Sequence, residues 1–209
     1  MTASALNLIR WFCAVITVLV PGLYIALVTF HPEDIPVKLA LSIAAAKQEV
    51  PFSTVFEVLI MLLAFEVLQE AGLRLPSPIG ATVSILGGLV VGNAAVEAHI
   101  VSPAVLIAVA IAGVAGYTMP SQDFASALRL WRFLLAIAAS IGGLFGLAAG
   151  CAALIYHLAG LETFGVPYLA PFTNGAGQPR GHPSLLRLPL PRMKWRDGAK
   201  NTKNRRNQR

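Results

Sequence analysis

The sequence predicts an all-α integral membrane protein with about five transmembrane helices, one interfacial or re-entrant helix and a disordered basic tail. Of the 209 residues, 56% are hydrophobic and only 12% are charged, whereas soluble domains average about 25% charged residues. Several apolar runs approach the roughly 20 residues that cross a hydrocarbon core. Three of these runs also carry small residues at every fourth position, a pattern that lets helices pack closely in lipid.

The first span is predicted from Trp11 to Phe30. This apolar run is longer than the hydrophobic region of a signal peptide, so we interpret it as a retained transmembrane helix. Arg10 and Trp11 open the run, and both residue types are favoured at the membrane interface. Pro21 and Gly22 are expected to bend the helix in its middle.

Residues 31–50 differ from the spans, because they hold five charged residues and are bounded by prolines. The apolar stretch within them, Leu39 to Ala46, is too short to cross a membrane. We therefore predict an interfacial or re-entrant helix here. The alternative is a surface helix packed on the spans.

The second membrane segment, Phe52 to Leu68, carries Glu57 and Glu66 inside an apolar run. A lone charge on a lipid-facing surface costs about 3 kcal/mol or more at the bilayer centre. We therefore predict that both acids are buried against a partner, a cavity or a pathway. Glu70 and Arg74 follow at a spacing that predicts a solvated ion pair at the helix end.

Small residues line one face of each of the next three segments, which predicts a tightly packed bundle or ring. The pattern does not distinguish packing within a subunit from packing between subunits. The third segment, residues 79–96, has Gly80, Ser84, Gly88 and Gly92 and is followed by Glu97; the fourth, residues 103–119, has Ala104, Ala108, Ala112 and Gly116; the fifth, residues 133–158, has Ala138, Gly142, Gly146 and Gly150.

Basic residues gather at two further places. Arg129, Trp131 and Arg132 precede the fifth segment and are predicted to anchor it at the interface. Ten of the 16 Lys and Arg residues follow Phe172. We assign residues 1–172 to the membrane domain and residues 173–209 to the tail, whose composition predicts disorder. Attraction to anionic lipid explains the basic tail better than nucleic-acid binding.

The sequence contains no phosphate-binding glycine loop, no zinc-protease motif, no paired-cysteine motif and no nucleophile elbow. Its four histidines are scattered and share no ligand spacing. We therefore predict a protein that is not an enzyme and holds no metal or cofactor. The combination of buried acids in one segment and small-residue faces in others suggests transport, conduction or signalling.

The run IPVKLALSIAAA, followed by EAGLRLPSPIG and AAVEAHIVSP, closely resembles the membrane domain of GerA-type spore germination proteins, including SpoVAF-like relatives. YTMPS, LRLWRF, GLFG and FGVPYLAPF extend the resemblance from about Arg10 to Phe172. Members of that family carry a sizeable cytoplasmic domain before the first span. It is absent here, so we expect a truncated or split gene, or a fragment.

The resemblance implies the A subunit of a nutrient germinant receptor in the inner spore membrane, working beside B- and C-type subunits. It also implies a homo-oligomer that forms a germinant-gated ion channel. In that case the small residues of the third segment, namely Gly80, Ser84, Gly88 and Gly92, are candidate pore walls, and Glu97 is a candidate for setting cation preference.

Two alternatives of other classes remain at this stage. One is a non-conducting structural component that organises receptor clusters, as a SpoVAF-like protein. The other is a secondary transporter with Glu57 and Glu66 as coupling acids, although the sequence lacks the internal inverted repeat typical of many transporters.

Overall fold

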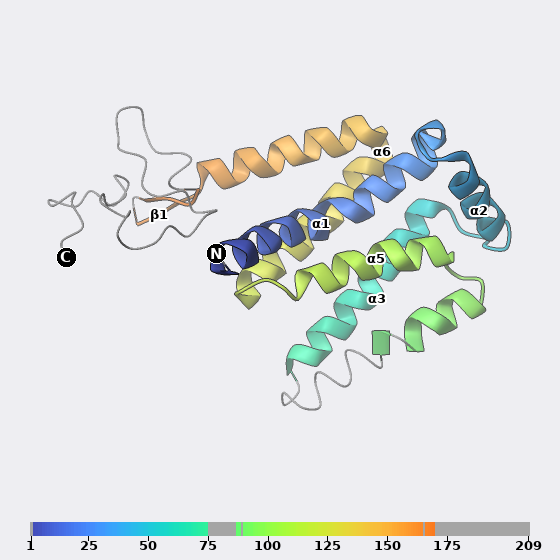
Figure 1. The fold of residues 1–209 in the computed structure, drawn as a ribbon, viewed down its shortest axis with the longest axis horizontal. Coiled ribbons are helices and arrows are strands. Elements are labelled where there is room, and N and C mark those ends of the chain that lie inside the picture. The colour runs from blue at the N-terminus through green and yellow to red at the C-terminus, as the bar shows by residue number, and fades with distance from the viewer. Residues whose placement is uncertain (1, 75–86, 89, 165, 170–209) are drawn as a thin grey trace, which may run out of the picture. The chain divides into compact units, whose positions relative to one another are not determined.

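A computed structural model describes residues 2–74, 87–88, 90–164 and 166–169 (Figure 1). The chain divides into two compact units, one formed by residues 13–150 and the other by residues 1–12 with 151–209. Each unit is described by itself. The helices are α1 (Thr2–Phe30), the 3₁₀ helix η1 (Pro32–Asp34), α2 (Val37–Lys47), α3 (Thr54–Arg74), α5 (Pro103–Gly116) and α6 (Gln122–Gly160), and residues 87–88 and 90–97 are also helical.

The predominantly helical fold agrees with the sequence prediction. Within the described residues, α1 and α6 are long and apolar enough to cross a membrane. Helix α5 is apolar but has only 14 residues, and α3 carries Glu57, Glu66, Glu70 and Arg74 along its 21 residues. The two long helices agree with the prediction of a membrane protein, whereas the number of about five spans stays a prediction.

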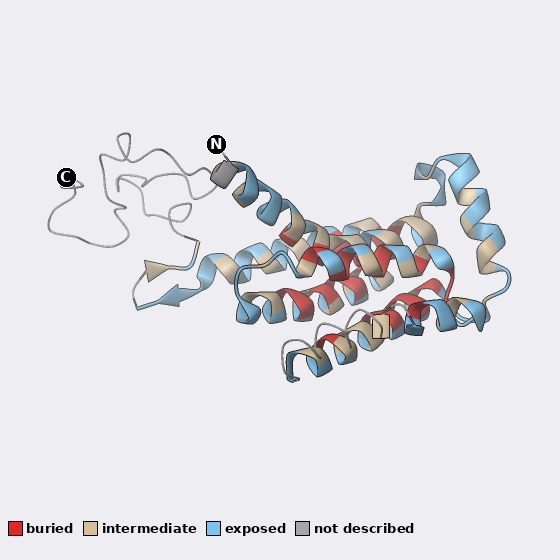
Figure 2. Cartoon of the chain, turned by 60° about the horizontal axis from the view of Figure 1, so that its bottom comes forward, coloured by how far each residue is buried: buried red, intermediate tan, exposed pale blue. Residues whose placement is uncertain are grey.

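Helices α3 and α5 form the centre of the unit of residues 13–150. They run in the same direction, because Glu57 contacts Ser102 at their starts, while Gly113 lies near Gln69 towards their ends. Their buried residues recur at helical spacing, as the red face in Figure 2 shows. The core includes Val58, Met61 and Leu62 of α3, Val105, Val109 and Ala112 of α5, and Leu135, Ala136 and Ala139 of α6.

Helix α6 is a hairpin of two helical arms and not one straight rod (Figure 1). The chain reverses at Gly143, whose φ of 57° and ψ of −136° are not helical. A Cβ placed on Gly146 would lie 2.1 Å from the Ala138 carbonyl oxygen, and one on Gly150 would lie 2.5 Å from Leu135. These contacts are impossible in a continuous helix, because eight residues advance it by about 12 Å. The prediction of one uninterrupted segment over residues 133–158 is therefore wrong.

Helix α2 projects from the rest of its unit, and none of its residues is buried (Figure 2). Val37, Leu39 and Leu41 expose half or more of their surface. The alternative of a surface helix packed on the spans is thus not what the structure shows. An interfacial helix agrees with this exposure, since apolar side chains at that position would enter lipid.

In the second unit, the described residues after α6 form a short antiparallel hairpin. Strand β1 (Glu162–Thr163) pairs with β2 (Val166–Pro167). The turn places Phe164 at a φ of 54°, and the Tyr168 amide donates to the Leu161 carbonyl at 2.8 Å. The predicted disordered tail, residues 173–209, lies outside the described residues.

Candidate functional site

A groove of about 780 Å³ opens between α3, residues 88–93, α5 and the first turns of α6. This volume falls in the range of about 300–1,000 Å³ that is usual for ligand pockets. Most of its lining is apolar, with Phe65, Leu68, Leu73, Leu106, Val114 and Met119. The polar side chains that line it are Thr17, Gln69, Asn93, Tyr117, Gln122, Arg129 and Arg132.

The two arginines on the polar side of the groove both pair with one carboxylate, that of Glu66. Arg129 Nε lies 3.3 Å from Glu66 Oε1, and Arg132 Nη2 lies 3.5 Å from Glu66 Oε2. Arg129 also donates from Nη1 to Gln69 Oε1 at 3.2 Å and from Nη2 to Ser126 Oγ at 2.7 Å. We call Glu66, Gln69, Ser126, Arg129 and Arg132 the arginine cluster.

Helical spacing explains how this cluster assembles. Glu66 and Gln69 are three residues apart on α3, and Arg129 and Arg132 are three residues apart on α6, so each pair shares one helix face. The guanidinium groups are buried, because the side chains of Arg129 and Arg132 are only 9% and 1% exposed. Buried charges are retained only when they are paired and hydrogen-bonded, and both arginines reach the same carboxylate.

The arginine cluster shows that the residues predicted as an interfacial anchor at the start of the fifth segment also form contacts within the chain, and the anchor itself stays a prediction. Arg129 and Arg132 are buried against α3, and Trp131 between them is half-buried. The sequence does hold a signal for this arrangement. The spacing of the two arginines matches that of Glu66 and Gln69, although no feature of the local sequence indicates that α6 packs against α3.

Glu57 forms a second polar contact, deep within the same unit. Its side chain is fully buried, and its Oε2 accepts a 2.8 Å hydrogen bond from the Ser102 backbone amide at the start of α5. Ser102 is the N-cap of α5, yet its own side chain makes no capping hydrogen bond. A carboxylate from α3 thus satisfies one of the free amides of α5 and lies at the positive end of that helix.

Replacing Glu57 with leucine is expected to loosen the first turn of α5. The Ser102 amide would lose its acceptor, and an unsatisfied buried donor costs about 1–3 kcal/mol. Hydrogen exchange at the Ser102 amide should accelerate roughly tenfold or more. Glu57→Gln is the control, because its amide oxygen still accepts, and equal exchange rates in the two variants would contradict this role.

Of the four predicted pore-wall residues, the structure describes Gly88 and Gly92. Gly80 and Ser84 lie outside the described residues. Gly88 lines the groove, and a Cβ on it would meet Phe65 at an ordinary 3.7 Å. Gly92 is buried, and a Cβ there would come within 3.0 Å of Leu106. In the described part of this helix, small residues therefore serve close packing on α3 and α5 of the same chain.

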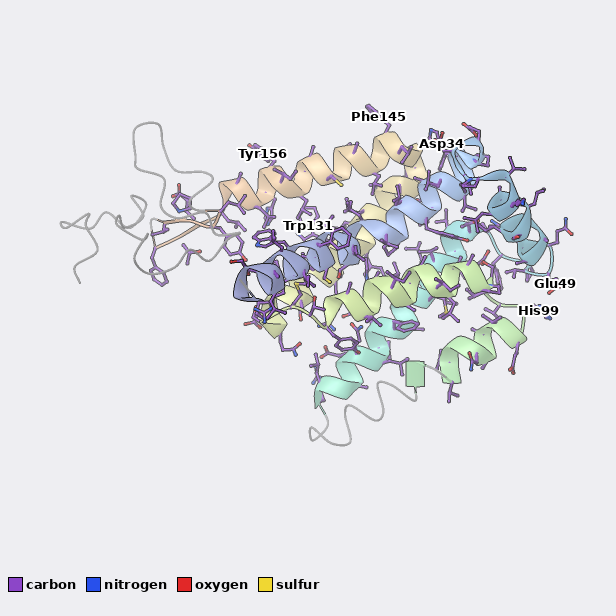
Figure 3. The ribbon with its side chains drawn as sticks, in the orientation of Figure 1. Asp34, Glu49, His99, Trp131, Phe145 and Tyr156 are labelled. Carbon is purple, nitrogen blue, oxygen red and sulfur yellow. The ribbon has the colours of Figure 1, made fainter. Side chains whose placement is uncertain are left out.

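Glu97 ends the helix that contains Gly92, and its side chain is exposed. Just beyond it, His99 adopts a φ of 52° and its Nδ1 lies 3.2 Å from Glu49 Oε2, after α2 (Figure 3). This contact, both of whose side chains are more than half exposed, joins the loop after α2 to the loop before α5. Glu97 lies next to that junction and away from the arginine cluster.

Across residues 2–74, 87–88, 90–164 and 166–169, no three His, Cys, Asp or Glu side chains gather in a way that could hold a metal ion. Cys13 and Cys151 are both free thiols. The chemistry of the groove is instead that of two buried cations beside an apolar wall. That arrangement can bind an anionic group or hold helices together.

Residues 1–199 match the family model described as Bacillus/Clostridium GerA spore germination protein. The chain belongs to this GerA family. The resemblance found in the sequence is thereby confirmed. No solved structure matches the chain.

Several curated relatives of this GerA-family chain agree with the family match. It is 46% identical over 167 residues to the uncharacterized membrane protein YfkQ of Bacillus subtilis, covering 78% of this chain and 33% of that protein. It is 43% identical to spore germination protein KA of Bacillus subtilis, covering 84% and 32%. Spore germination protein XA of Bacillus anthracis is 35% identical, with 92% and 39% covered. The chain thus spans roughly a third of the length of these relatives.

Proposed function

We propose that this chain is the membrane region of an A-type germinant receptor subunit that acts in spore germination. It works in the inner spore membrane beside B- and C-type subunits and oligomerises around a path for ions. The observation that carries this proposal is the family match over residues 1–199, together with relatives named as spore germination proteins. The long apolar helices α1 and α6 support a location in a membrane.

The exposed face of the helix at residues 90–97 supports its assignment as the wall of the proposed ion path. Residues 90–97 use Gly92 to pack inwards, and they expose Val90, Ala94 and Glu97 on the outer face. Glu57 and Glu66 are bound to partners within the chain, so Glu97 is the acid of the predicted set whose carboxylate is exposed. Repeated by oligomer symmetry, it would form an acidic ring of the kind that favours cations.

Glu97→Gln is expected to reduce cation release during germination without changing receptor abundance. The physical reason is that the neutral side chain no longer concentrates cations at the mouth of the path. The measurement is potassium release from spores that carry the variant in the complete receptor, with its B- and C-type subunits. Glu33→Gln, at an exposed acid in η1, is the matched control.

A conductance measurement separates this function from a non-conducting structural role. The structural role is favoured by one observation: Gly92, Glu57 and Glu66 are all engaged in contacts within the chain. Cation currents from the reconstituted receptor that decrease in Glu97→Gln but not in Glu33→Gln support the channel. The structural role would be established instead by two results together. The reconstituted wild-type receptor would show no cation current, and receptor clusters in spores would disperse when this chain is deleted.

A further inference from the structure

The arginine cluster holds more positive than negative charge. Within the part of the chain that the structure describes, Arg129 and Arg132 share the single carboxylate of Glu66. Arg132 lines the groove, and its buried Nε has no hydrogen-bond partner among the described residues. An uncompensated buried guanidinium is costly, so the groove has the chemistry to accept one further anionic group.

The cluster also lies just before the most apolar part of α6. Arg132 directly precedes Phe133, where α6 becomes continuously apolar. Helix α3 ends at Arg74, α5 ends at Gly116, and α6 begins at Gln122, all at the same end of this unit (Figure 1). Basic pockets between transmembrane helices near a membrane surface are suited to anionic head groups.

We propose that the groove binds one anionic phospholipid. Its phosphate lies on Arg129 and Arg132, because guanidinium groups form charge-assisted hydrogen bonds with phosphate oxygens. Its acyl chain covers the apolar wall formed by residues such as Leu68, Leu106 and Val114. A small soluble anion would satisfy the charge but would leave this wall uncovered, which is why the proposal commits to a lipid.

The test measures lipid retention by native mass spectrometry. The chain is purified in a zwitterionic detergent and offered equal amounts of phosphatidylglycerol and phosphatidylcholine. We expect one phosphatidylglycerol to be retained per chain, with a preference of roughly tenfold or more, the size of one good charge-assisted interaction. Equal retention of the two lipids would overturn the proposal.

Two variants test the two ends of the site separately. Arg132→Gln should lose the preference for phosphatidylglycerol, whereas Arg74→Gln, at an arginine whose side chain is 79% exposed, should keep it. Val114→Trp fills the groove without touching any charge and should lower total retention, whereas Val67→Trp, on a similarly exposed valine outside the groove, should not. If Arg132→Gln does not fold, the comparison of Val114→Trp with Val67→Trp still tests the proposal.

A competition experiment distinguishes a lipid from a free anion as the occupant of the groove, and the measured mass shows whether a second copy of the chain binds there. Glycerol phosphate carries the head-group charge but no acyl chain, so it should displace phosphatidylglycerol only at a large excess. Displacement at equal concentration would show that the groove binds a free anion, and the lipid proposal would then be wrong. A dimer mass that disappears in Val114→Trp would assign the groove to a second copy of the chain and would equally overturn it.

Discussion

Replacing Glu66 with glutamine is expected to lower the free energy of unfolding by about 3 kcal/mol. The carboxylate pairs with two arginines, whose side chains are 9% and 1% exposed. Removing one partner of a buried ion pair typically costs about 3–5 kcal/mol, because the remaining charge is left uncompensated. The lower value is expected here because the Glu66 side chain is itself 29% exposed. Denaturant titration of the purified chain in micelles gives the measurement.

Glu70→Gln is the matched control for this variant, because Glu70 lies one turn further along α3 and pairs with Arg74. That pair is exposed, with side chains 48% and 79% accessible, and exposed ion pairs contribute about 0–1 kcal/mol. Adding Arg132→Gln to Glu66→Gln should recover part of the loss, since it removes one unpaired charge. Equal stability of Glu66→Gln and Glu70→Gln would show that the arginine cluster is not what holds α3 to α6.

Replacing Gly143 with alanine is expected to destabilise the chain by a similar amount, about 3 kcal/mol, and to disturb the α6 hairpin. Its φ of 57° and ψ of −136° lie outside the regions that L-residues normally adopt, which costs about 1–3 kcal/mol. A Cβ there would also lie 3.0–3.2 Å from three atoms of Phe30, and overpacking adds about 1–3 kcal/mol. Thermal unfolding in micelles measures the loss.

The neighbouring glycine provides a control with the same chemical change. Gly142 has helical geometry, and a Cβ on it would meet nothing within 4 Å, so Gly142→Ala should be neutral or slightly stabilising. Combining Gly143→Ala with Phe30→Ala removes the contacts with the Phe30 ring and leaves the backbone strain together with the 3.1 Å contact to the Cβ of residue 30. If Gly142→Ala and Gly143→Ala are equally stable, the reversal at Gly143 does not constrain the hairpin.

Both predictions concern features that local patterns describe only in part. The apolar run from Phe133 to Leu158 and its small residues predicted a close-packed helix, and close packing is what Gly146 and Gly150 provide. They provide it against the other arm of the same hairpin. A hydropathy pattern records which residues tolerate lipid, but it does not record the single φ value that reverses the chain.

For the two acids of α3 as well, the sequence predicted one part of the arrangement and not the other. The cost of an isolated charge in lipid predicted partners for Glu57 and Glu66, and the structure supplies partners for both. The identity of these partners was not predictable, because Ser102 lies 45 residues beyond Glu57 and Arg132 lies 66 residues beyond Glu66. The ion pairs of Arg129 and Arg132 with Glu66 were not predicted, because an arginine beside tryptophan looks the same locally at a lipid interface and in an internal ion pair.

The sequence by itself determined that this protein is helical and apolar, that it belongs with the GerA family, and that its embedded acids require partners. Composition, apolar run length and the solvation cost of charge are properties of residues and their near neighbours, so they can be calculated along the chain. Only the tertiary structure decided that α6 folds back at Gly143, that two arginines share Glu66, and that a groove opens beside them. Those features depend on which distant helices meet, and packing in three dimensions settles that choice.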